Sequence, residues 1–119
     1  MVSKVKKGYN KEKRIRDELV KAGWIIVFKS IRYRFGTIDF AGLFDVVAFK
    51  GKQRKYISSK HLGPGNYYLK HQKDIREFKD TYGKDGESFE LWLWDKPRWK
   101  GKGKNKTWNK GCFIKVVIK

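Results

Sequence analysis

The chain has 119 residues, with 30 Lys and Arg against 12 Asp and Glu, and a formal net charge of +18 at pH 7. That length leaves no room for a second sizeable core, so we expect one domain over residues 1–119. No apolar run is long enough to span a membrane, and the Lys-rich start lacks the apolar segment of a secretory signal. We therefore expect an intracellular protein, in the cytoplasm or in a host's cytoplasm if a virus encodes it.

The one-sided charge favours a polyanionic partner, and we expect nucleic acid, above all DNA. The alternatives are a solvated basic surface on a heat-adapted protein, or a basic structural protein of a ribonucleoprotein. Membrane-surface binding favours a long basic amphipathic helix, whereas the basic helix here is needed for the core, so we expect no membrane partner. The single cysteine, Cys112, excludes an internal disulfide, and we expect it in the core.

Two segments have the composition of helices. Residues 10–22 combine strong helix formers with Asn10 as a candidate cap and Gly23 as a stop. A helix there has an inward stripe of Ile15, Leu19 and Ala22. Residues 67–82 follow a Gly-Pro-Gly loop and predict a second helix, whose inward stripe is Tyr68, His71, Ile75, Phe78 and Tyr82.

Five segments rich in β-branched and aromatic residues predict strands. Between them we expect a glycine-containing basic loop at 32–42 and a flexible basic loop with two Trp at 96–110. The resulting order, α-β-β-β-α-β-β, indicates an α/β domain with a mixed central sheet of about five strands flanked by helices. The expected strands are residues 24–31, 43–49, 54–60, 87–94 and 112–118.

Two acids occupy positions where charge is expensive. Glu12 falls inside the apolar stripe of the first helix, and Asp45 interrupts an apolar strand. A buried charge needs an ion pair, hydrogen bonds or a bound cation. Lys60, at the end of the neighbouring strand, is a candidate cationic partner, and carboxylates of this kind suit Mg²⁺. The alternative is a set of ordinary salt bridges, which a chain with 30 cations forms easily.

Four short motifs follow one another in a recognisable order: Gly8-x-x-x-Glu12, Leu19 to Gly23–Trp24, Phe44–Asp45–Val46–Val47–Ala48 and Ile57–Ser58–Ser59–Lys60. Over about residues 8–95 they resemble the archaeal-type Holliday junction resolvases of the PD-(D/E)XK nuclease superfamily. The resemblance implies a restriction-endonuclease-like fold and an endonuclease that cuts DNA phosphodiesters with Mg²⁺ or Mn²⁺. It also implies a homodimer on branched DNA, and we expect an interface on the strand face at 92–94.

Carried over position by position, the resemblance makes Glu12 and Asp45 metal ligands and Lys60 the motif lysine. The family has an acid two residues before that lysine, where this chain has Ser58, a neutral and weak ligand. Asp39 is a candidate substitute, or else a turn residue. If nothing replaces the acid, the chain is a non-catalytic nucleic-acid-binding module of the same fold.

Further residues are candidates for holding DNA. Arg32 and Arg34 flank an aromatic residue in the loop beside the proposed site, as in a phosphate clamp, although a solvated loop is the alternative. Trp99 and Trp108 are candidates to stack on exposed bases, or else to anchor their loop. His71 is expected as a core histidine rather than a general base. The resemblance also implies that Ser30 contacts the scissile backbone. The candidate set is Ser30, Arg32, Arg34, Lys70, Arg98, Trp99, Lys100, Lys102, Lys104 and Trp108.

Overall fold

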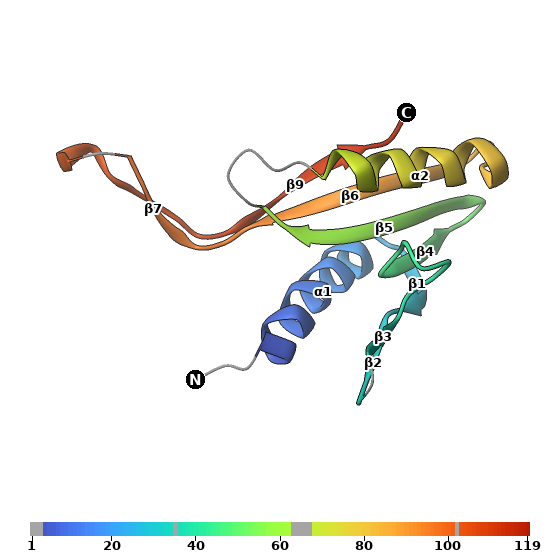
Figure 1. The fold of residues 1–119 in the computed structure, drawn as a ribbon, viewed down its shortest axis with the longest axis horizontal. Helices are drawn as coiled ribbons and strands as arrows, with labels where there is room; N and C mark the ends of the chain where they lie inside the picture. Colours follow the sequence, from blue (N-terminus) through green and yellow to red (C-terminus); the bar gives the residue numbers. More distant parts are fainter. Residues whose placement is uncertain (1–3, 35, 63–67, 102) are drawn as a thin grey trace.

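The computed structural model describes residues 4–34, 36–62, 68–101 and 103–119. These residues form two α-helices, a five-stranded sheet and two short hairpins (Figure 1). The elements are α1 (Lys4–Lys21), β1 (Ile25–Lys29), β2 (Ile31–Tyr33), β3 (Gly36–Ile38), β4 (Val46–Lys50), β5 (Gln53–His61), α2 (Leu69–Tyr82), β6 (Glu87–Asp95), β7 (Arg98–Lys100), η1 (Gly103–Asn105), β8 (Thr107–Asn109) and β9 (Cys112–Val117).

The main sheet has the strand order β1-β4-β5-β6-β9. Strands β5 and β6 are parallel, and the other neighbouring pairs are antiparallel, so the expected α/β class with a mixed sheet is confirmed. Helix α2 connects β5 to β6, because a parallel pair needs a crossover. The parallel register aligns Lys60 with Leu93 and His61 with Trp94. The C-terminal ends of β5 and β6 therefore lie at the same end of the sheet.

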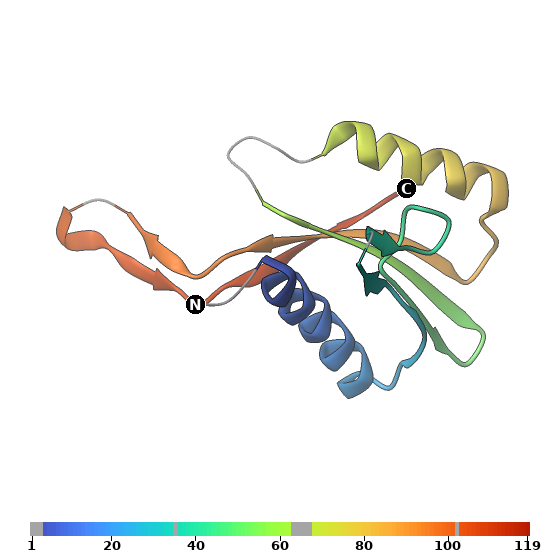
Figure 2. The ribbon, with the colours of Figure 1, turned by 60° about the horizontal axis from the view of Figure 1, so that its bottom comes forward.

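The two helices lie on opposite faces of this sheet (Figures 1 and 2). On the α1 face, Ile15 and Leu19 pack against residues of β4, β5 and β6. On the α2 face, Ile75 packs with a largely aromatic set around Phe44 and Phe89. Because both faces are covered, the middle of β6 is buried on both sides, including the completely buried Leu91 and Leu93. Trp92, at 1% exposure, is not available for the interface expected on this strand.

Helix α1 is longer than the sequence indicated. It begins at Lys4, so Asn10 lies inside the helix and is not its cap. The extra turns carry no apolar periodicity and include Gly8, which has low helix propensity, so the pattern gave no reason to begin there. The end was predicted correctly, since Gly23 follows with a φ of 92°. Ala22 is exposed rather than part of the buried stripe.

Two expected loops contain strands. The segment at 32–42 is largely a hairpin, in which β2 pairs with β3 and Ile31 lies opposite Ile38. The segment at 96–110 is also a hairpin, formed by β7, η1 and β8, so the expectation of an irregular loop was wrong. Cys112 is exposed and not in the core. None of the described helices has the length and apolar character needed to cross a membrane.

Candidate active site

Two aspartates meet where the β2–β3 hairpin returns to the main sheet. A tight turn joins Phe40 to Phe44, which form an isolated antiparallel bridge. Within that turn, Ala41 and Gly42 both have positive φ, of 54° and 69°. An antiparallel bridge puts the residues that flank it opposite each other, so Asp39 faces Asp45. The turn therefore explains how Asp39, six positions earlier in the sequence, becomes a neighbour of Asp45.

The hydroxyl of Ser30 lies between the two carboxylates. Its Oγ is 2.6 Å from Asp39 Oδ1 and 3.1 Å from Asp45 Oδ1. A serine hydroxyl has one hydrogen to donate, so it donates fully to only one of the two carboxylates at a time. Ser30 is held in place by its backbone N–H, which donates to the carbonyl oxygen of Asp45 at 2.8 Å. The two acids thus share a single donor hydrogen at this point.

Strand β5 fixes the other side of the Asp45 carboxylate. Oδ2 accepts the backbone N–H of Ser59 at 2.7 Å and the Ser59 hydroxyl at 3.0 Å. The backbone N–H of Asp45 donates to the carbonyl oxygen of Ile57 at 2.8 Å, which ties the residue to the same strand. The carboxylate is therefore oriented from β5 on one side and from the end of β1 on the other.

No described basic side chain neutralises either aspartate. In the part of the chain that the structure describes, Asp39 and Asp45 form hydrogen bonds but no ion pair. This is unusual for a chain with 30 Lys and Arg, in which a cationic partner is easily found. Among the described residues, Asp45 is thus held by hydrogen bonds and not by the salt bridge that is the ordinary alternative. A pair of carboxylates held only by neutral donors favours a bound cation.

Lys60 and His71 lie on the α2 side of this end. Lys60 is half-buried on β5 and forms no ion pair with any described residue. Burial lowers the pKa of His71, and the charge of Lys60 lowers it further, while Asp74, Asp45 and Asp39 oppose the change. The imidazole is therefore predominantly neutral at pH 7. The mutual influence of these charges indicates that α2 borders the acidic site.

The hydroxyl of Ser58 forms a hydrogen bond with a residue of helix α2. It is 1% exposed, and its Oγ lies 2.7 Å from His71 Nε2. His71 is thus a half-buried, hydrogen-bonded histidine, as its place on the inward stripe indicated. The position at which the resolvases have an acid carries here a hydroxyl that is bound to an imidazole.

The other proposed ligand, Glu12, lies on helix α1. Glu12 is 3% exposed on α1, one turn before Ile15, on the face that packs against the sheet. Within the described residues, no group of three or more His, Cys, Asp or Glu side chains is arranged to hold a metal ion. The acidic site therefore offers two carboxylates rather than three.

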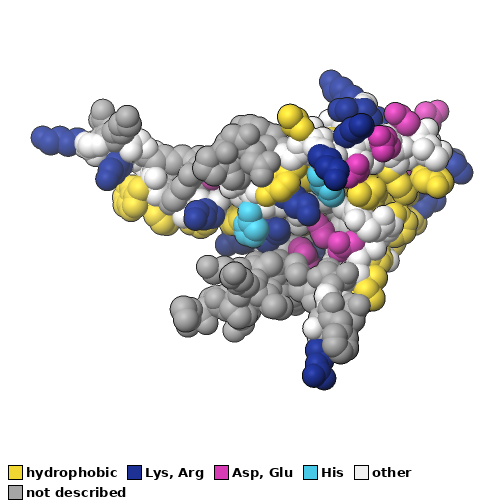
Figure 3. Space-filling view, viewed as in Figure 1, with side chains coloured by type: hydrophobic (Ala, Val, Ile, Leu, Met, Phe, Trp, Pro, Cys, Tyr) yellow, Lys and Arg dark blue, Asp and Glu magenta, His cyan; other side chains and the backbone are white. Residues whose placement is uncertain are grey.

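Figure 3 shows acidic, histidine and basic side chains together in the middle of one face, between α2 and the β2–β3 hairpin. Among the DNA-binding candidates, Lys70 is exposed on the first turn of α2, and Arg34 is exposed at the tip of the β2–β3 hairpin. Lys102 lies outside the described residues, and so do the side chains of Arg32, Arg98 and Lys100. Trp99, Lys104 and Trp108 are exposed on the β7–β8 hairpin, and the last candidate, Ser30, lies between the two aspartates.

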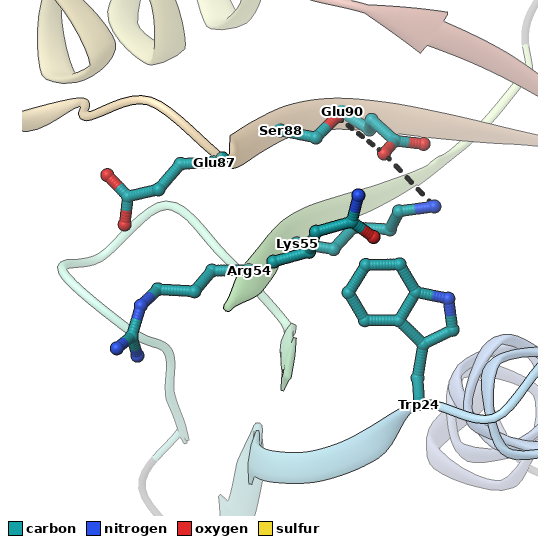
Figure 4. A pocket seen from close by; sticks show the side chains of 8 residues that line it. Trp24, Arg54, Lys55, Glu87, Ser88 and Glu90 are labelled. Carbon is teal, nitrogen blue, oxygen red and sulfur yellow. Dashed lines mark hydrogen bonds and ion pairs between the residues drawn. The ribbon is translucent and has the colours of Figure 1, made fainter. Parts of the chain in front are cut away.

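A separate buried acid lies beside the middle of β5, where Glu90 is aligned with Ile57 (Figure 4). Glu90, 4% exposed, pairs with Lys55 Nζ at 3.4 Å. It also accepts hydrogen bonds from the Ser88 hydroxyl at 2.8 Å and from Trp92 Nε1 at 3.0 Å. The hollow beside it is lined by Trp24, whose ring faces the Lys55 ammonium at 4.8 Å. Here the acid is neutralised internally, so the cluster is explained as structure.

Sequence reasoning missed two groups of the acidic site. Ser59 was treated only as part of a motif, although its N–H and hydroxyl both bind Asp45. The contact of His71 with Ser58 was also missed, because it depends on how α2 docks on the sheet. One available signal was the Phe-Ala-Gly-Leu-Phe turn, since a tight turn between matching aromatics sets the flanking acids opposite each other.

Comparison of the chain with protein-family models, with curated protein sequences and with solved structures found no match. The resemblance to the resolvases therefore rests on the motifs quoted above. What the site can do follows from its chemistry.

Proposed function

We propose that this chain is a metal-dependent endonuclease of restriction-endonuclease-like fold, which hydrolyses phosphodiester bonds of DNA, including branched DNA such as Holliday junctions. The observation that carries the proposal is the pair Asp39 and Asp45. They are held together by hydroxyl and amide donors, with no ion pair among the described residues of a chain whose net charge is +18. Two acids left facing each other in a basic protein suit a divalent cation.

The residues at this end fit Mg²⁺ or Mn²⁺. Mg²⁺ is usually bound through one or two carboxylates, with waters and substrate phosphates as the remaining ligands. Asp39 and Asp45 would hold the ion, and Asp39 would stand in for the acid that Ser58 replaces. Glu12 stays a candidate ligand through its burial on α1. A divalent cation bound there supplies an activated water and neutralises charge on the phosphoryl group.

The protein groups have separate tasks in the proposed hydrolysis, in which a water oxygen bonds to phosphorus and a phosphorus–oxygen ester bond breaks. Ser30 and Ser59 orient the carboxylate of Asp45 from two sides. The ammonium of Lys60, unpaired among described residues, stabilises negative charge that develops on the phosphoryl oxygens. On a four-way junction, paired cuts require a twofold homodimer that presents two such sites.

A second candidate function is a nucleic-acid-binding module that does not cut. It is favoured by the state of Ser58, which is buried and occupied by His71 instead of serving as an acid ligand. It is also favoured by the number of carboxylates, since the described residues offer no group of three acids or histidines. Such a module would keep the basic surface and lose the reaction.

The deciding experiment is a cleavage assay on an end-labelled four-way junction and a matched duplex, with Mg²⁺ or Mn²⁺. We expect wild type to cut, and Asp45→Asn and Lys60→Ala to bind the DNA with the cleavage rate reduced by about 100-fold or more. Asp17→Asn is the matched control, because Asp17 is an exposed acid on α1 that pairs only with Lys13 at 2.9 Å among the described residues. It should cut like wild type. Tight binding by wild type without cleavage, with either metal, would favour the binding module.

A further inference from the structure

The β7–β8 hairpin extends away from the body as an arm, defined here as residues 96–110 (Figures 1 and 2). It continues strands β6 and β9, whose last pairs before the arm are Trp94 with Phe113 and Asp95 with Cys112. The molecule is correspondingly elongated, with principal extents of 49 × 33 × 30 Å. A two-stranded extension of this kind buries little of its own surface, so its side chains are available to a partner.

The root of the arm is packed and fixes its direction. Gly111 has a φ of 89°, and a Cβ there would lie 2.8 Å from the Trp94 ring and 3.0 Å from Pro97. Only glycine fits this approach. The Trp94 ring also packs on Phe113, with centroids 4.9 Å apart, and Arg14 of α1 lies over it at 5.0 Å. The arm therefore leaves the body from a defined, close-packed base, which reduces the ordering cost of binding.

Two tryptophans occupy directly opposed positions on the arm. Trp99 pairs with Trp108 in the register of β7 and β8, and their rings are T-shaped with centroids 5.3 Å apart. They stay 64% and 52% exposed. Large aromatic rings are costly to leave in water, and this pair lies beyond the core clusters. Exposed rings on a fixed hairpin present flat faces to a ligand.

The charge around these rings defines the ligand. Residues 96–110 contain seven Lys or Arg and no Asp or Glu. Lys104, Lys106 and Lys110 are exposed on the arm. Aromatic faces interleaved with cations suit a polyanion that carries π-faces, which is nucleic acid with unpaired bases. Paired bases in a duplex are stacked on each other and offer no free face, so the rings distinguish single strands and branch points from duplex.

We propose that the arm binds unpaired nucleotides, with Trp99 and Trp108 stacking on the bases and the neighbouring lysines contacting phosphates. The proposal deepens the proposed function and rests on it only in taking nucleic acid as the ligand, since no residue of the acidic site takes part. The arm also begins at the same end of the sheet as Lys60, because β5 and β6 are parallel. Nucleotides held on the arm would thus lie toward the same end of the molecule as the acidic site.

The test is binding without cleavage, in EDTA, using a labelled 20-nucleotide single strand and the corresponding duplex. We expect Trp99→Ala/Trp108→Ala to lose about tenfold or more in single-strand affinity and to change duplex affinity by less than about threefold. Trp99→Phe/Trp108→Phe should recover most of the loss, since Phe keeps a ring. The salt dependence of single-strand binding should not change, because no charge is removed, whereas Lys104→Gln/Lys106→Gln should lower it.

The matched control is Tyr82→Ala, an aromatic that is 65% exposed on α2, which should bind both DNAs like wild type. Thermal unfolding checks that each variant is folded.

Unchanged single-strand affinity in the double Ala variant would overturn the proposal, and so would an equal loss of affinity for duplex. A larger loss on anionic phospholipid vesicles than on single strands would overturn it in favour of a lipid ligand. If wild type binds through the Trp pair but cuts no DNA, the proposal for the arm is supported and the nuclease proposal fails. If wild type cuts DNA but its single-strand affinity does not depend on the Trp pair, the nuclease proposal is supported and the proposal for the arm fails.

Discussion

Two clusters of acids beside strand β5 are held in opposite ways. In one, the buried Glu90 has a lysine, a hydroxyl and an indole N–H as partners, so its charge is compensated inside the protein. In the other, the half-buried Asp39 and Asp45 share one hydroxyl, and only neutral donors among the described residues contact them. Burial of an acid alone therefore does not indicate a functional site. The informative feature is a pair of facing acids for which the described chain supplies no compensating cation.

The largest expected difference between the two acidic clusters is in stability. Glu90→Ala removes an ion pair and two hydrogen bonds and leaves Lys55 without its acid, so we expect a loss of about 3 kcal/mol in the free energy of unfolding. Asp45→Asn keeps acceptors for Ser59 and removes the repulsion with Asp39, so it should lose less than about 1 kcal/mol. Urea unfolding in EDTA measures both. A larger loss for Asp45→Asn would make that aspartate a structural residue.

The second difference is the response to divalent cations. If Asp39 and Asp45 hold Mn²⁺, the metal at ten times its Kd should stabilise wild type by about 1.4 kcal/mol, seen as a higher unfolding temperature. The increase should disappear in Asp39→Asn and Asp45→Asn and persist in the matched control Asp17→Asn. An equal increase in all four proteins would mean that Mn²⁺ binds elsewhere.

The third difference concerns the serines that donate to each cluster. Ser30→Ala removes the hydroxyl shared by two carboxylates, and Ser88→Ala removes a donor to Glu90; each should cost about 1 kcal/mol without metal. Mn²⁺ should reduce the cost of Ser30→Ala, because the ion neutralises the facing carboxylates. It should leave the cost of Ser88→Ala unchanged, since Lys55 already compensates Glu90. Thermal unfolding of both variants with and without Mn²⁺ gives the comparison, which fails if the two respond alike.

The smallest expected effect is a pH dependence at the aspartate end. Because the pKa of His71 is lowered in the folded protein, the unfolded chain binds a proton more readily. Its contribution to stability is therefore present above the usual histidine pKa and is lost as the pH falls through the lowered, folded-state pKa. In EDTA, the unfolding free energy of wild type should fall over this window, and His71→Gln should lack that part of the decrease. His61→Gln, at an exposed position, is the control and should keep it.

Much of the main sheet could be predicted because its signals are local. The five strands and the crossover helix follow from runs of apolar and β-branched residues, and the acid just before β4 and the lysine in β5 stand out against those runs. The β2–β3 and β7–β8 hairpins were missed because glycines and arginines or lysines outweigh their short strands. The pairing of such short hairpins depends on the strands from which they extend. The local composition carries no information about those strands.

The candidate site was only partly predictable for the same reason. Asp45 and Lys60 are visible as charges within apolar or β-branched runs, although Asp45 lies just before β4 and not within it. Ser30 was named from the family resemblance and Asp39 from its position six residues before Asp45. That one hydroxyl joins Asp39 to Asp45 depends on a turn closed by two phenylalanines and on the end of β1. The contacts of Ser59 and His71 depend on strand register and on the docking of α2, which are non-local.

The parallel pairing of β5 with β6 limits the distance between Lys60 and the tryptophans of the arm. Lys60 is aligned with Leu93, and Trp99 lies six residues further along the same strand direction. At about 3.3 Å per residue, the rings lie at most about 20 Å from the lysine along the protein. Nucleic acid rises about 3.4 Å per nucleotide, so that length corresponds to about six nucleotides. If the chain cuts DNA as proposed, a strand engaged by the Trp pair would be cut within about six nucleotides of its unpaired bases, a limit set by arm length and not by base sequence.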